Sequence, residues 1–113
     1  MDLPKEPTFE QKGLKGYAFS LKNKDLEVYY LDVSKGHDNY IVSKKCFHMY
    51  YVLEGTGVFD LNGKTIDVRR GSFLEVVPNI EYTYSGNMKL LMIMNPPWFE
   101  GNEKVTKPNP SVD

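Results

Sequence analysis

The sequence predicts an all-β domain, and three observations support this. Short segments rich in β-branched and aromatic residues recur along the chain, and these segments are separated by glycine, proline and asparagine. No segment keeps a sustained helical period. The 113 residues suffice for one hydrophobic core and are too few for two ordinary ones. A series of short strands separated by turn residues is typical of a sandwich or a barrel, and periodicity does not choose between the two.

The first predicted strands lie in the N-terminal half. Residues 16–21 fit an edge strand, and residues 26–33, with the sequence LEVYYLDV, fit a strand that the polar stretch 34–39 ends. Residues 40–44 and 46–53 follow as two further strands.

The C-terminal half continues the series. Gly55 and Gly57 mark the next connection in the predicted order. The dipeptide Asn62-Gly63 then separates two apolar-polar segments, VFDL and KTIDV, and predicts a tight hairpin that needs positive φ angles. The remaining strands are predicted at residues 72–77, 81–85 and 89–94.

Charge and composition narrow the classes of partner. The 14 basic residues nearly balance the 15 acidic ones, so no overall field favours nucleic acid or an anionic membrane. The longest apolar run, 90–94, is far shorter than the roughly 20 residues that span a bilayer. The N-terminal residues lack the apolar core of a signal peptide, and the single cysteine, Cys46, excludes an internal disulfide. We therefore expect a cytoplasmic protein that binds neither nucleic acid nor membrane.

A stretch in the middle of the chain resembles the first signature motif of the cupin family. That motif is a glycine, five residues, His-x-His, three or four residues, a glutamate, six residues and a glycine. Gly36 and Gly55 fit its two glycines with the spacing intact. The two histidine positions fall on Val42 and Lys44, and the glutamate position falls on His48.

The second cupin motif starts in register at Gly71. Pro78 stands one place later than the family's proline, and Asn79 replaces the following glycine while still tolerating a left-handed turn. Tyr82 replaces the motif's histidine. The resemblance implies a small single-domain cupin, an antiparallel jelly-roll barrel or double-stranded β-helix, whose metal-binding motifs are degenerate.

One barrel with two looser ends is the expected organisation. Residues 1–15 alternate charge with proline and are expected to form a flexible lead, residues 16–94 to form the cupin barrel, and residues 95–113, with four prolines, to form an irregular tail. Trp98 and Phe99 are too apolar to be left in water, so we expect the tail to pack on the barrel or on a partner subunit. A homodimer through edge strands or through this aromatic tail is the predicted assembly.

The resemblance also predicts a ligand site at the former metal centre. Three histidines and a glutamate hold a divalent metal in the family, and only His48 is a good ligand here, so we predict no metal and no other cofactor. Lys44 is expected either to face a carboxylate or phosphate of a ligand, or to extend to solvent or pair with an acidic side chain. The predicted ligand-binding residues are Val42, Lys44, His48, Tyr50 and Tyr82.

Several functions are compatible with this site. The leading prediction is a metal-independent cupin that binds a small polar or anionic molecule, of sugar or carboxylate type, in the barrel interior. An alternative is a metal-independent sugar isomerase or epimerase with His48 as catalytic base and Tyr82 as catalytic acid. A further alternative, a metal-dependent cupin enzyme, needs atypical ligands such as His37, Glu75 or Glu81. A structural role is predicted if side chains fill the interior.

Overall fold

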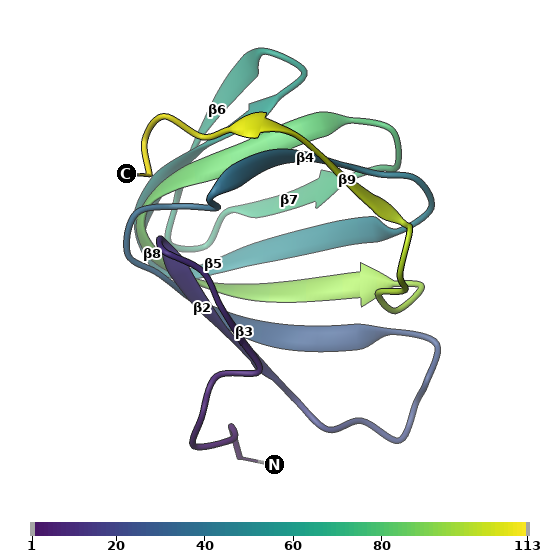
Figure 1. Cartoon of the computed structure of the whole chain (residues 1–113). Coiled ribbons are helices and arrows are strands. Elements are labelled where there is room, and N and C mark those ends of the chain that lie inside the picture. The colour runs from purple at the N-terminus through teal and green to yellow at the C-terminus, as the bar shows by residue number, and fades with distance from the viewer. Residues whose placement is uncertain (1, 113) are drawn as a thin grey trace.

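The computed structural model describes residues 2–112, which form strands and turns without any helix. The described chain contains nine strands in one antiparallel sheet that curls on itself (Figure 1). The predicted all-β class is confirmed. No segment of residues 2–112 is a helix long and apolar enough to cross a membrane. The strands are β1 Phe9–Glu10, β2 Leu14–Ala18, β3 Glu27–Val33, β4 Asn39–Ser43, β5 Phe47–Leu61, β6 Lys64–Arg69, β7 Phe73–Val76, β8 Glu81–Asn95 and β9 Glu103–Pro108.

Strand β8 organises the sheet. Its C-terminal half pairs with β3 on one side and β5 on the other, and its N-terminal half pairs with β4 and with the far end of β5. The remaining pairs are β1 with β2, β2 with β3, β4 with β9, and β5 with both β6 and β7. Because one pair of long strands connects all the others, the sheet bends around a single concave face, and the core lies there.

Both long strands differ from the sequence prediction. The predicted strands 81–85 and 89–94 are two parts of β8, and β5 runs without interruption through Gly55 and Gly57. A bulge between Val52 and Glu54 bends β5 instead of ending it. A bulge adds one residue to one strand only, so the buried face changes from even-numbered residues before it to odd-numbered residues after it.

The hairpin predicted at Asn62-Gly63 is confirmed. These residues have φ angles of 50° and 85° and join β5 to β6. The Asp60 carboxylate accepts the Gly63 N–H at 2.9 Å, and the Asn62 side-chain oxygen accepts the N–H of Glu81 at 2.8 Å. The turn is therefore also tied to the start of β8.

The expectation of an irregular tail is wrong for residues 103–108, which form β9 beside β4 (Figure 1). The buried side chain of Asn102 holds the start of β9: its amide donates to Ser43 Oγ at 2.8 Å and its oxygen accepts the Lys45 N–H at 2.8 Å. Part of the lead predicted to be flexible is also ordered in the sheet, as β1.

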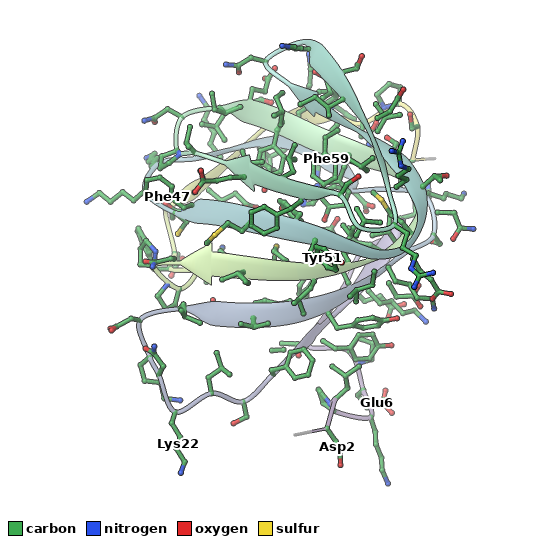
Figure 2. The ribbon with its side chains drawn as sticks, turned by 180° about the vertical axis from the view of Figure 1, so that it is seen from behind. Asp2, Glu6, Lys22, Phe47, Tyr51 and Phe59 are labelled. Atoms are coloured by element: carbon green, nitrogen blue, oxygen red, sulfur yellow. The ribbon has the colours of Figure 1, made fainter. Side chains whose placement is uncertain are left out.

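Aromatic side chains fill the centre of the concave face. Tyr50, Phe59 and Tyr84 are buried and pack with ring centroids 4.9–5.5 Å apart. On the opposite, convex face β5 exposes Phe47 and Tyr51, which Figure 2 labels on the side turned to the viewer. The homodimer through edge strands or the tail stays a prediction.

Candidate functional site

A cavity of about 430 Å³ lies on the concave side of the sheet, next to the aromatic core. Methionine, isoleucine, phenylalanine and tryptophan side chains form its apolar wall, and tyrosines, histidines and glutamates supply most of its polar groups. Cavities of this size and mixed lining are typical of small-molecule sites. The polar part of the lining includes Gln11, Glu27, Tyr29, His37, His48, Tyr50, Tyr82, Tyr84 and Glu103.

A second hollow, of about 570 Å³, lies among β5, β6 and β8. Its lining has no histidine, tyrosine or cysteine, and its two charged residues, Asp67 and Arg69, are two positions apart on β6. Although this hollow is larger, the groups suited to acid-base chemistry are in the first cavity.

The structure brings three of the five predicted ligand-binding residues together. His48, Tyr50 and Tyr82 line the cavity. Val42 and Lys44 do not line it: Val42 is half-buried on the other face of β4, and Lys44 is exposed in the turn after it, as the solvent-facing alternative for this lysine predicts. Side chains alternate along a strand, and the turn between β4 and β5 shifts the alternation by one residue. Ile41 therefore takes the inward position that the motif spacing assigns to Val42.

His48 is a buried imidazole without a hydrogen-bond partner at one nitrogen. Its side chain is 2% exposed, and Nδ1 has no partner among the described residues. Its ring lies 6.2 Å from the Tyr50 ring and 5.9 Å from the Tyr82 ring. Burial lowers the pKa of His48 to about 4, against the opposing effect of the Cys46 backbone. The ring is therefore neutral at pH 7.

This neutral histidine predicts a loss of stability in acid. The unfolded chain, with a histidine pKa near 6.5, binds a proton between pH 6.5 and 4 that the folded chain does not. The free energy of unfolding should therefore be highest above pH 6.5 and fall toward pH 4, by on the order of 3 kcal/mol from this residue. Urea unfolding at several pH values measures the decline. His48→Gln should flatten it, and an unchanged decline would contradict the assignment.

Tyr50 and Tyr82 form a buried hydroxyl pair. Their oxygens are 2.6 Å apart, and either hydroxyl can be the donor. Burial raises the pKa of both tyrosines well above its ordinary value, and it does the same for Tyr84. All three phenols therefore keep their protons at neutral pH, and the cavity presents hydrogen-bond donors deep in its wall.

His37 is the second histidine in the cavity, and it is held by polar contacts on both ring nitrogens. Nδ1 lies 2.8 Å from the carbonyl oxygen of Asn39 and 3.2 Å from the Asn39 backbone nitrogen, and we assign the proton to Nδ1 because its contact with the carbonyl oxygen is the shorter one. Nε2 lies 3.3 Å from the amide nitrogen of Gln11, which can only donate. The side-chain oxygen of Gln11 accepts the Asp38 N–H at 3.1 Å, which fixes the amide in this orientation. Burial lowers the pKa of His37. The result is a neutral ring whose lone pair is on Nε2.

Segments from both ends of the chain fix the loop that carries His37. The buried side chain of Asn109 donates to the carbonyls of His37 at 2.9 Å and Tyr84 at 3.2 Å. The carboxylate of Asp38 accepts the N–H groups of Lys12 and Gly13, both at 2.9 Å. Neither contact is local in sequence, so the position of His37 depends on the completed fold.

Five polar residues of the site were not predicted from the sequence, namely Gln11, Glu27, Tyr29, Tyr84 and Glu103, and His37 was predicted only as a possible metal ligand. His37 directly follows the motif glycine Gly36. Tyr84 is two residues from Tyr82, so strand alternation was a usable signal for it. Glu103 had no such signal, because it is on β9, within the tail expected to be irregular.

The donor set does not fit the divalent metal of the family. Among residues 2–112, no group of three or more histidine, cysteine, aspartate or glutamate side chains is arranged to hold a metal ion. Of the atypical ligands considered, His37 lines the cavity, whereas Glu75 is exposed on β7 and Glu81 forms an ion pair with Lys107 at 3.7 Å. These side chains therefore do not supply the three protein ligands that a catalytic metal of this kind needs.

Taken together, the curled antiparallel sheet and its interior cavity define a cupin barrel, and solved structures agree with this fold. The nucleoside dehydratase Pac13 of Streptomyces is 23% identical, with a TM-score of 0.85 over 93% of this chain and 88% of that one. A protein from Planctomyces limnophilus has a TM-score of 0.78 at 15% identity, over 91% and 92% of the two chains. Ectoine synthase from P. lautus has a TM-score of 0.67 at 16% identity, over 89% and 81%.

These likenesses establish the fold alone, and the cupin prediction is confirmed at that level. No protein-family model and no curated protein matches the sequence. Three single-residue variants of Pac13 are also similar to this chain, each with a TM-score of 0.85 and 22% identity. Two of them replace a tyrosine with phenylalanine and one replaces a histidine with glutamine, and all three contain uridine.

Proposed function

We propose that this chain binds a nucleoside in the barrel cavity and catalyses the loss of water from it, with His37, Tyr50 and Tyr84 as the catalytic residues. The supporting observation is the spacing of these three residues along the sequence. Tyr50 follows His37 by 13 positions, and Tyr84 follows Tyr50 by 34. The histidine and the two tyrosines exchanged in the Pac13 variants with uridine follow one another at the same intervals.

The geometry of the three residues supports the same proposal. All three line the cavity. The Tyr84 ring lies 5.5 Å from the Tyr50 ring and 5.8 Å from the His37 ring, edge-on to both. The residues come from β5, β8 and the loop before β4, so their meeting in one cavity is a property of the fold and not of local sequence.

The protonation states suit an elimination of water. When a bound nucleoside displaces the Gln11 amide from Nε2, a neutral His37 accepts a proton there from a carbon of the sugar. The C–H electron pair forms a C=C bond, and the C–O bond of the neighbouring carbon breaks. The hydroxyl of Tyr50 donates a proton to the departing oxygen, which leaves as water. Tyr82, whose hydroxyl is hydrogen-bonded to that of Tyr50 at 2.6 Å, orients the Tyr50 hydroxyl. Tyr84 packs against the ring of His37.

The first test of this proposal is binding of uridine. At a concentration of 100 times Kd, uridine should stabilise the fold by about 2.7 kcal/mol, measured as a shift in thermal unfolding. Free ribose is the control, since it lacks the base that fills the apolar part of the cavity. Mass spectrometry of incubated uridine derivatives should then detect a product lighter by one water. Absence of both stabilisation and product would refute the proposal.

A second candidate function is a metal-independent sugar isomerase or epimerase that uses His48 and Tyr82. The unpartnered Nδ1 of His48 supports it, because a buried nitrogen without a hydrogen bond is available to a ligand. This reaction exchanges a carbon-bound proton with solvent and loses no water. Deuterium incorporation without loss of mass as water, abolished by His48→Gln, would favour it over dehydration.

A further inference from the structure

The cavity contains acidic groups and no basic side chain of fixed charge. Among the described residues that line it, Glu27 and Glu103 are the carboxylates, and neither lysine nor arginine is present. The two histidines are neutral near pH 7, because burial lowers the pKa of each. A ligand that enters therefore meets negative charge without a compensating cation.

The two carboxylates differ in how they are engaged. Glu27 accepts the Trp98 N–H at 2.7 Å through one oxygen and the Tyr29 hydroxyl at 3.4 Å through the other. By contrast, no hydrogen bond or ion pair to the Glu103 carboxylate occurs within residues 2–112, and burial raises the pKa of this group. The Glu103 charge also raises the pKa values of Tyr50, Tyr82 and Tyr84, so the carboxylate is close to the buried end of the cavity.

A second group in the same cavity also lacks a partner. The side chain of His48 is only 2% exposed, and its Nδ1 has no hydrogen bond among the described residues. Buried polar groups in folded proteins are nearly always hydrogen-bonded, to protein, to water or to a ligand. Glu103 and His48 together therefore point to a bound molecule that offers hydrogen bonds to them.

We infer that the cavity selects uncharged nucleosides and excludes nucleoside phosphates, and that Glu103 sets this preference. The inference rests on the proposed nucleoside function and narrows its class of ligand. A carboxylate accepts hydrogen bonds from the hydroxyl groups of a sugar and the N–H groups of a base. A phosphate monoester at neutral pH carries up to about two negative charges and mainly acceptor oxygens, so it is repelled by the same carboxylate.

The lysines of this region do not offset the charge. Of the two alternatives for Lys44, the structure fits extension to solvent, because Lys44 is exposed and outside the cavity, and Lys45 and Lys104 are exposed as well. A phosphate would also find no helix N-terminus, because residues 2–112 contain no helix. Of the small polar or anionic ligands predicted from the sequence, the anionic ones are therefore disfavoured, and the neutral polyhydroxylated ones remain.

Calorimetric titration with uridine and with uridine 5′-monophosphate tests this inference. The wild-type protein should bind the monophosphate about 30-fold more weakly than uridine, or worse, because like charges that face each other without screening are costly. Glu103→Gln should narrow this difference by about tenfold, since it removes the charge and keeps the shape. Glu75→Gln is the matched control: it removes an equal charge from the exposed face of β7 and should leave the ratio unchanged.

The possible outcomes separate the two proposals. Equal or tighter binding of the monophosphate by the wild-type protein would overturn the selectivity and leave nucleoside binding intact. A difference that Glu103→Gln does not narrow, or that Glu75→Gln narrows equally, would overturn the role of Glu103. Failure of both compounds to bind would refute the proposed function itself, and the inference with it.

Discussion

Replacing His37 with glutamine should reduce the rate of nucleoside dehydration by about 10²- to 10⁴-fold, the usual contribution of a positioned general base. Glutamine keeps a polar side chain of similar length but has no lone pair that can hold a proton at neutral pH. The main-chain contacts of residue 37, with Tyr84 and Asn109, do not involve the imidazole and should persist. Uridine binding should therefore survive while turnover is lost. Single-turnover kinetics with a nucleoside that the wild-type protein dehydrates measures the effect.

His48→Gln is the matched control, because the chain has two histidines and both line the cavity. The same substitution at His48 removes the other imidazole from the same cavity. If His37 is the base, His48→Gln should weaken nucleoside binding, because it removes a ligand contact, but at saturating nucleoside it should lower the single-turnover rate far less than His37→Gln does. The reverse pattern, with turnover lost in His48→Gln and kept in His37→Gln, would transfer the role of base to His48.

The second large expected effect is the loss of stability when Gly55 is replaced. Its φ is 85°, and an added Cβ would lie 2.2 Å from the carbonyl oxygen of Asn87 and 2.8 Å from the Cα of Met88, both backbone atoms of β8. Gly55→Ala should lower the free energy of unfolding by roughly 3 to 5 kcal/mol, because the substitution combines strain at a special φ with a clash that no side-chain rotation relieves. Urea denaturation measures it.

Gly71 provides the control for this prediction. Its φ of 91° is nearly the same as that of Gly55, but an added Cβ would meet no atom within 4 Å. Gly71→Ala should therefore lower the free energy of unfolding only by the cost of placing alanine in the left-handed region, about 1 to 2 kcal/mol. The difference between the two variants isolates the close approach of β5 to β8. Equal losses would show that this approach contributes nothing to stability.

Features that depend on local chemistry could be predicted from the sequence. The Asn62-Gly63 hairpin was predicted because few residue pairs adopt two positive φ angles in succession. Asn79, placed at the motif's turn glycine, has a φ of 71° as required there. The all-β class and most strand positions likewise follow from residue type and short-range alternation. The inward direction of His48 and Tyr82 was implied by their places in the cupin motifs, and that of Tyr50 followed from alternation with His48 along one strand.

Features that depend on pairing between distant segments needed the tertiary structure. Val42 and Lys44 were assigned inward because alternation was carried across the turn before β5, where it changes phase. Glu103 enters the cavity only because β9, a segment of low β propensity with a proline at its end, pairs with β4. His37 reaches the cavity because Gln11 and Asn109, from opposite ends of the chain, hold its loop. The sequence by itself determined the strands and turns of the barrel, and tertiary contacts decided which polar side chains share its interior, because register and long-range pairing leave no local pattern.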